Sequence, residues 1–220
     1  MIQMPDFAKA FEYENNFFLS SSPSRIGKLL AHFEFFQMVV EKPGDIIEFG
    51  VLKGCSLVRW ATFRDLFSVP HSRKIIGFDS FGRFPETDFV PDQPYRQRHI
   101  EICGEESISK DQLKEVLAHK NLTEGIDLIK GDIMETLPEY LKRHPQARFS
   151  LINIDVDIYE PSKLILEECF PRLVKGGVLL MDDYGKFPGE TKAVDDYFSG
   201  TSYELQRFPF SDTPTFIVRQ

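Results

Sequence analysis

Carboxylates stand at the ends of two apolar runs in the second half of the chain, in the segments Asp155-Val-Asp157 and Asp182-Asp183. If these runs are neighbouring strands, two or three carboxylates converge, which is costly unless a proton or a cation separates the charges. Oxygen-only ligands with room for water select a hard ion, magnesium before calcium. We therefore expect Asp155, with at least one of Asp182 and Asp183, to bind a metal ion. The alternative is that some of these acids cap helices, as Asp157 would if a helix enters at Glu160.

A glycine-cornered loop follows an earlier apolar run, in the segment Asp45-Ile-Ile-Glu-Phe-Gly-Val-Leu-Lys-Gly-Cys-Ser56. The pattern predicts a strand, a tight turn framed by Gly50 and Gly54, and then a helix, so that bare backbone can approach a ligand. The spacing differs from the G-x-G-x-x-G of dinucleotide sites. Glu48, two residues before the first glycine, suits a ligand with a positive amino group better than a pyrophosphate. S-adenosylmethionine is such a ligand.

Two further acids follow apolar runs and are candidate cofactor contacts. In a nucleotide-binding fold, an acid in the place of Asp79 accepts hydrogen bonds from the two ribose hydroxyls. The alternative is that Asp79 caps a turn with Ser80, which we also regard as a candidate contact. Asp132 either contacts the adenine ring or belongs to a common Gly-Asp turn, and the sequence does not decide between these roles.

Short apolar runs alternate with helical patterns through most of the chain, and turn residues bound each run, as is typical of strands. Strands are predicted at residues 45–50, 74–79, 126–131, 149–155 and 177–182. Helices are predicted at residues 24–41, 55–67, 107–119, 136–143, 160–173 and 189–199. This alternation predicts a doubly wound, mostly parallel α/β sheet with helices on both faces. The last two runs, 203–209 and 214–219, predict an antiparallel hairpin at the C-terminal edge.

Two segments lie outside this alternation. Residues 81–106 contain three prolines, at positions 85, 91 and 94, and no clear element is predicted at their start. An insertion of this length is usually functional or poorly ordered, and it leaves the carboxyl end of a strand, so we predict a lid. Residues 1–44 are predicted as an N-terminal helical cover segment, whose aromatic residues either cover the site or build a dimer contact.

The composition favours one soluble globular domain. The chain has 220 residues, with 42% hydrophobic and 27% charged residues and a formal net charge of -8. The negative charge and the scattered basic residues argue against a nucleic-acid partner. The cysteines Cys55, Cys103 and Cys169 cannot all pair, which favours a reducing compartment. No run is long enough to span a membrane and no leader pattern opens the chain, so a cytoplasmic location is expected.

Four of these motifs, in this order, resemble the macrocin O-methyltransferase family. Its members are small S-adenosylmethionine-dependent enzymes that methylate sugar hydroxyls of natural products. The motifs are Glu48–Ser56, Asp79-Ser-Phe81, Asp155–Glu160 and Asp182-Asp-Tyr184. More distantly, the chain is similar to catechol O-methyltransferase, which shares the metal-dependent layout. The resemblance covers residues 45–200, and the first 44 residues match the family poorly.

The resemblance implies a seven-stranded methyltransferase sheet in residues 45–220 with the cofactor at its carboxyl edge. The residues that it implies around the methionine end of the cofactor are Glu48, Gly50 and Ser56. It also implies Asp79 on the ribose, the loop of Gly131 and Asp132 beside the adenine, and a magnesium ion on Asp155, Asp182 and Asp183.

The expected reaction is methyl transfer to a hydroxyl of a small molecule. The resemblance suggests a sugar-bearing natural product or glycan precursor as the acceptor. Bound magnesium lowers the pKa of a hydroxyl and holds its oxygen, and Asp155 is the expected base. Catechol enzymes carry a lysine three residues after the first metal aspartate, where Ile158 stands here, so a lysine base at that position is not expected. Two alternatives stay open: a metal-independent methyltransferase with Asp155 or Asp157 as base, and a non-catalytic nucleotide-binding module.

Overall fold

A computed structural model describes residues 2–220, and these residues build an α/β sheet of six strands. The strands are β1 (Asp45–Phe49), β2 (Ile75–Asp79), β3 (Ile126–Lys130), β4 (Phe149–Ile154), β5 (Leu173–Met181) and β6 (Thr215–Val218). Their order across the sheet is β3-β2-β1-β4-β5-β6. The first five are parallel and β6 is antiparallel to β5. The predicted parallel sheet with an antiparallel C-terminal edge is confirmed.

The strand order reverses between β1 and β4, which pair side by side although more than one helix separates them in the chain. In an open α/β sheet, ligands bind outside the carboxyl ends of the strands at this switch point. Every residue of β2 and of β4 is buried, because helices cover both faces of the sheet. The fold therefore directs the loops after β1 and β4 to the place where a ligand would lie.

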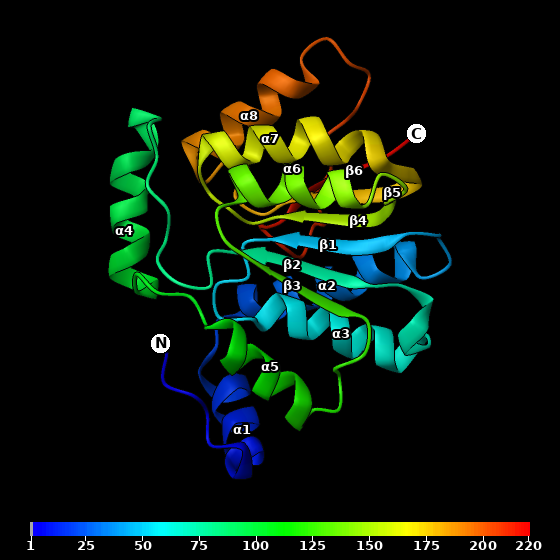
Figure 1. The fold of residues 1–220 in the computed structure, drawn as a ribbon. Coiled ribbons are helices and arrows are strands. Elements are labelled where there is room, and N and C mark those ends of the chain that lie inside the picture. The colour runs from blue at the N-terminus through cyan, green and yellow to red at the C-terminus, as the bar shows by residue number, and fades with distance from the viewer. Residues whose placement is uncertain (1) are drawn as a thin grey trace.

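Helices form a layer on each side of the sheet (Figure 1). One layer contains α2 (Pro23–Val39), α3 (Cys55–Phe67) and α5 (Lys110–His119), and the other contains α6 (Ile133–Arg143), α7 (Tyr159–Cys169) and α8 (Pro188–Phe198). Each layer has its own apolar core against the sheet, with Phe35 and Trp60 in the first and Ile152 and Leu166 in the second. Burial of these side chains is the main force that fixes the helices on the sheet.

The predicted seventh strand, at residues 203–209, does not form among the described residues. Only Gln206 pairs with the sheet, through two 2.9 Å backbone hydrogen bonds to Phe216. Pro209 has no N–H group to donate to a ladder. The aromatic residues of the segment also pack apart, since Tyr203 contacts Phe170 and Phe198 whereas Phe208 contacts Phe35 and Phe216. The segment therefore crosses the edge of the sheet at a single bridge instead of extending it.

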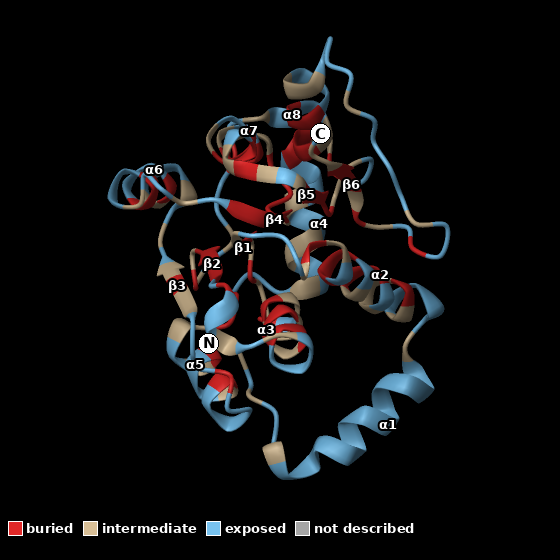
Figure 2. Cartoon of the chain, turned by 90° about the vertical axis from the view of Figure 1, so that its right-hand side faces the viewer, coloured by how far each residue is buried: buried red, intermediate tan, exposed pale blue. Residues whose placement is uncertain are grey.

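The N-terminal segment is helical but divides into two different parts. The helix α1 (Ala10–Ser20) has no buried residue and lies away from the rest of the chain (Figure 2). By contrast, α2 buries six residues, among them Phe35 and Phe36, in the same core as α3. The second half of the predicted cover segment thus belongs to the sheet's own helical layer. Whether α1 covers the site or forms a dimer contact stays a prediction.

The segment at residues 81–106 is folded. It contains a short 3-10 helix, η3 (Val90–Asp92), and the helix α4 (Gln93–Cys103), and a bridge between Arg83 and Glu106 ties its two ends together. Figure 1 shows α4 beyond the carboxyl ends of the strands. No helix among residues 2–220 is long and apolar enough to cross a membrane.

Candidate active site

A cavity of about 490 Å³ opens at the carboxyl ends of the strands. The predicted site residues that line it are Gly50, Asp79, Ser80, Asp132 and Asp155. Residues 81–106 supply a second wall, to which Phe84 and His99 contribute. The loops after four parallel strands and the segment predicted as a lid therefore enclose one space.

Gly50 is required by the backbone that crosses in front of it. Its φ is +87°, and a Cβ atom at this position would lie 1.7 Å from the carbonyl oxygen of Asp155. The backbone N–H of Asp155 in turn donates to the carbonyl of Phe49 at 2.9 Å. The glycine therefore allows the loop after β1 to approach the backbone at the end of β4 closely. This contact fixes the position of the Asp155 backbone, from which its side chain extends.

Glu48 is fully buried and lies behind the cavity wall. Its carboxylate accepts hydrogen bonds from Ser56 Oγ (2.9 Å), Trp60 Nε1 (2.7 Å) and Asn153 Nδ2 (3.4 Å). Burial raises the pKa of Glu48 to about 7, although the three donors oppose that rise. Neither Glu48 nor Ser56 lines the cavity, so their contact with the methionine end of a cofactor stays a prediction.

The Asp79 carboxylate organises the loops that surround it. One oxygen accepts the backbone N–H groups of Val51 (2.8 Å) and Leu52 (3.0 Å). The other accepts the N–H of Phe81 (2.6 Å) and the hydroxyl of Ser107 (2.7 Å). A carboxylate has about four acceptor positions, so ribose hydroxyls would have to share or replace these donors.

The other two candidate cofactor contacts also have local partners. Asp132 caps α6, because its Oδ1 accepts the backbone N–H of Met134 at 2.8 Å. Its second oxygen remains free to meet a ligand at the cavity surface. The Ser80 hydroxyl donates to the carbonyl of Arg83 at 2.8 Å. Both residues therefore shape loops that line the cavity, and their contact with a cofactor stays a prediction.

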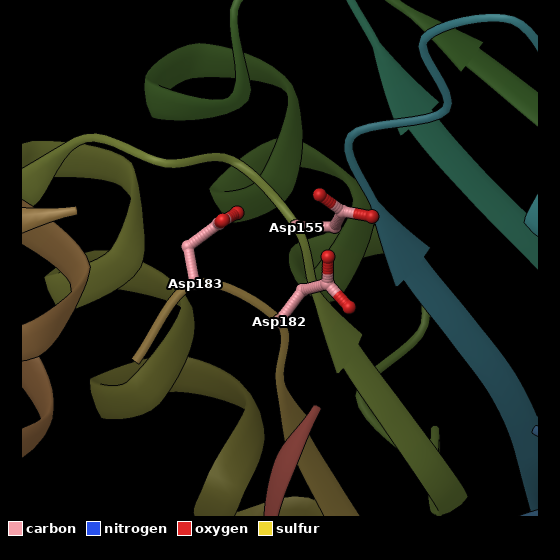
Figure 3. Close-up of side chains that lie close together, drawn as sticks. All are labelled: Asp155, Asp182 and Asp183. Atoms are coloured by element: carbon pink, nitrogen blue, oxygen red, sulfur yellow. The ribbon is translucent and has the colours of Figure 1, made fainter. Parts of the chain in front are cut away.

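Asp155, Asp182 and Asp183 come together at the ends of β4 and β5. Each offers an oxygen, and the three oxygens lie within 4.8 Å of one another; the side chains point toward a common space (Figure 3). The convergence follows from the register of the two strands. Ile154 of β4 pairs with Met181 of β5, and the acids are the next residues along each strand. Asp182 is buried and its Oδ1 has no hydrogen-bond partner. Three carboxylates with an unsatisfied buried oxygen fit a hard divalent cation.

Burial and mutual repulsion make this region a strong proton or cation acceptor. The pKa values of Asp155 and Asp183 are well above the usual range for aspartate, first because of desolvation and then because of the neighbouring carboxylates. Asp157 and the fully buried Glu190 of α8 show pKa values raised for the same reasons. Glu190 Oε1 accepts the backbone N–H of Asp183 at 2.8 Å and so fixes the turn after β5.

A lysine from the N-terminal segment reaches the same carboxylates. The Lys28 ammonium, on α2, lies 2.6 Å from Asp182 Oδ2 and 3.9 Å from Asp155 Oδ2. Desolvation lowers the pKa of Lys28, but attraction to Asp155 and Asp182 outweighs it and the net shift is upward. Sequence reasoning missed this contact, because nothing in the spacing of a helix far upstream indicates which strand end it meets.

Asp92 ties the segment at residues 81–106 to the helices beside the acidic cluster, a contact that sequence reasoning also missed. Its fully buried carboxylate accepts the backbone N–H groups of Tyr159 (3.0 Å) and Gly189 (2.7 Å), at the N-termini of α7 and α8. Negative charge is favoured at helix N-termini. The only available sequence signal was an acid between the prolines at positions 91 and 94, and such a pattern is too common to interpret.

Glu160 fastens the first part of the segment at residues 81–106. Its carboxylate accepts the Thr87 hydroxyl at 3.0 Å and the backbone N–H of Phe89 at 2.9 Å. His99 of α4 faces the cavity, with its Nδ1 3.9 Å from Asp157 Oδ1 and its ring stacked on Phe84. The segment at residues 81–106 is therefore held from two sides and presents an imidazole to the acids at the end of β4.

A doubly wound sheet with a cavity at its switch point and acids at the strand ends defines an α/β protein built to bind a nucleotide-like ligand. The family model described as "Macrocin-O-methyltransferase (TylF)" matches residues 25–204. This chain belongs to that methyltransferase family. The resemblance inferred from the four motifs is thereby confirmed.

Two relatives from Streptomyces are named as O-methyltransferases. The chain is 29% identical over 160 residues to the 8-demethyl-8-(2,3-dimethoxy-alpha-L-rhamnosyl)-tetracenomycin-C 4'-O-methyltransferase of Streptomyces olivaceus. It is 26% identical over 161 residues to the demethyldecarbamoylnovobiocin O-methyltransferase of Streptomyces niveus. Each match covers 70% of this chain and 58% of the relative, so the chain spans little more than half the length of these enzymes.

Solved structures show the same fold. The crystal structure of the calicheamicin methyltransferase CalS11 superposes with a TM-score of 0.78 at 30% identity, covering 97% of this chain and 86% of that one. The structure of the O-methyltransferase NovP superposes with a TM-score of 0.75 at 22% identity, covering 89% of this chain and 80% of the other.

Proposed function

We propose that this chain is an S-adenosylmethionine-dependent O-methyltransferase that acts on a hydroxyl of a sugar-containing natural product or glycan precursor. The observation that carries the proposal is the cavity that joins Asp79 and Asp132 at one side to Asp155 at the other. In a member of the macrocin O-methyltransferase family, this space suits a cofactor and an acceptor together. The sugar acceptor is proposed because the named relatives act on rhamnosyl and novobiocin compounds.

For the cofactor, we propose contacts from Gly50, Asp79, Ser80 and Asp132 at the cavity surface. Glu48 and Ser56 would support the methionine end from behind the loop, since they hydrogen-bond each other at 2.9 Å beneath it. The buried acid favours a positively charged group nearby, because that charge stabilises its ionised form.

For the metal, Asp155, Asp182 and Asp183 would hold Mg²⁺, which supplies Lewis-acid stabilisation of the acceptor oxygen when bound. These residues orient the acceptor hydroxyl against the cofactor methyl group, and orientation alone can supply several kcal/mol of the barrier. The Asp155 carboxylate, which lines the cavity, accepts the hydroxyl proton in this proposal.

One contact favours a second candidate, a methyltransferase that needs no metal. Lys28 already places a positive charge on Asp182 and Asp155, so part of the repulsion in the cluster is relieved by the chain itself. In this alternative, Asp157 is the base, because it lies at the cavity surface and faces His99. The two candidates differ in whether activity requires a divalent ion.

Calorimetric titration separates these possibilities. Wild type and Asp183→Asn are titrated with S-adenosylmethionine and with S-adenosylhomocysteine, each with Mg²⁺ and with EDTA. Micromolar cofactor binding by both proteins, with a magnesium heat only in wild type, supports the metal-dependent transferase. Cofactor binding with no magnesium heat supports the second candidate. If neither cofactor binds to wild type, both candidates are wrong and a non-catalytic module is favoured.

A further inference from the structure

Lys28 contacts the acidic cluster but has no part in the proposed metal-dependent reaction. It lies in the second turn of α2, and its side chain is 20% exposed although it carries a full charge. The ammonium group contacts two of the three candidate metal ligands, Asp182 at 2.6 Å and Asp155 at 3.9 Å. The lysine therefore lies inside the cluster and not at its solvent edge.

The position of the ammonium group has a direct electrostatic consequence. A divalent cation held by Asp155, Asp182 and Asp183 would lie within a few ångströms of the Lys28 nitrogen, because both cations would share the carboxylates of Asp155 and Asp182. Two positive charges at such a separation repel strongly in a partly desolvated site. A lysine side chain has a long flexible stem and a compact charge, so it is able to withdraw toward solvent when another cation takes its partners.

A purely structural ion pair would be made to a carboxylate that has no other role. Here both partners of Lys28 are candidate metal ligands, and Asp182 still has a buried oxygen without a partner. The arrangement resembles a cation site in which one ligand set serves two alternative cations.

We propose that Lys28 is the resident counter-ion of the acidic cluster and that it competes with the divalent ion for Asp155 and Asp182. The inference rests on the metal site of the proposed function. In this proposal α2 influences metal binding through Lys28. The lysine neutralises the carboxylates when no metal ion is bound, and it must leave Asp182 as the ion binds. Metal affinity is then lower than the three carboxylates alone would give.

The test measures Mn²⁺ binding by electron paramagnetic resonance, which needs no turnover. Wild type is compared with Lys28→Met, which removes the charge, and with Lys28→Arg, which keeps it. The matched control is Arg25→Met, which removes an exposed positive charge from the same helix one turn earlier. We expect Lys28→Met to bind Mn²⁺ at least tenfold more tightly than wild type, and Lys28→Arg and Arg25→Met to stay within about threefold of wild type.

A second measurement keeps the proposal testable if the methionine variant folds poorly. Lys28→Gln is compared with wild type by thermal unfolding in EDTA and in Mn²⁺. The variant should unfold at a lower temperature in EDTA, where its acids lack a counter-ion, and should gain more from Mn²⁺ than wild type does. If Lys28→Met and Lys28→Gln bind Mn²⁺ no more tightly than wild type does, Lys28 does not compete with the ion, although the metal site itself is retained. No Mn²⁺ binding by any protein would overturn the metal site as well.

Discussion

Replacing Glu48 by glutamine should change how the stability of the protein depends on pH. Glu48 is fully buried, and its pKa rises from 4.5 to about 7 in the folded chain because of desolvation. Between these values the folded chain binds more protons at this site than the unfolded chain does. The stabilisation from the protonated carboxyl is therefore complete below pH 4.5 and is lost as the pH rises through 7.

The size of the effect follows from the two pKa values. Each tenfold change in proton affinity corresponds to about 1.4 kcal/mol, so the rise implies a loss of about 3 kcal/mol from pH 4.5 to above pH 7. Glutamine keeps the shape of the side chain and does not titrate; its oxygen can accept from Trp60 and its NH₂ group can donate to the Ser56 hydroxyl. Relative to wild type, Glu48→Gln should gain about 3 kcal/mol over this interval.

Urea unfolding at a series of pH values measures this difference. Circular dichroism follows the transition, because the single tryptophan, Trp60, touches the mutated side chain and its fluorescence would change for local reasons. Glu34→Gln, an exposed acid on α2, is the control and should follow wild type. If Glu48→Gln and wild type show parallel stability from pH 4.5 to 8, Glu48 is not a buried acid with a raised pKa.

Three further substitutions test how the site is positioned. Gly50→Ala should destabilise the fold by roughly 2–4 kcal/mol, because alanine at this position combines a positive φ with a clash against the Asp155 carbonyl. A change in the free energy of unfolding within about 0.5 kcal/mol, measured with urea, would contradict that packing. Asp92→Ala should expose residues 81–106 to limited proteolysis, because two buried N–H groups at the helix starts lose their acceptor at roughly 1–3 kcal/mol each. Asp88→Ala, at an exposed position, is its control, and equal cleavage of both proteins would show that Asp92 does not hold residues 81–106 in place. Asp132→Ala should cost about 1 kcal/mol through loss of the α6 cap, and an unchanged urea midpoint would argue that the cap contributes nothing.

The sequence was sufficient to predict the sheet and the acidic cluster for a physical reason. Parallel strands in a doubly wound sheet end at one edge, so acids after apolar runs must meet there. Once β4 and β5 were read as neighbours, Asp155 and Asp182 had to lie side by side. Local patterns gave the strands and the acids at their ends, whereas the pairing of β4 with β5, on which the convergence depends, is established by the structure.

Features that depend on packing between distant segments could not be predicted in this way. Lys28 reaches Asp182 because α2 packs against β4 and β5, and no local pattern in the sequence indicates that packing. No local pattern indicates that the Glu48 carboxylate, which stays a predicted cofactor contact, accepts a hydrogen bond from Trp60 of the next helix. The predicted strand at residues 203–209 failed because its aromatic side chains pack in different directions, although the apolar pattern itself is typical of a strand.

Methyl transfer itself tests the central claim most directly. Wild type, freed of metal and then supplied with Mg²⁺ or EDTA, is incubated with S-adenosylmethionine and a rhamnosyl glycoside, and the product is analysed by mass spectrometry. We predict that the acceptor gains one methyl group with Mg²⁺, that EDTA abolishes the gain, and that Asp183→Asn fails under both conditions. Equal methylation with EDTA and with Mg²⁺, or full activity in Asp183→Asn, would contradict a metal-dependent O-methyltransferase built on these three carboxylates.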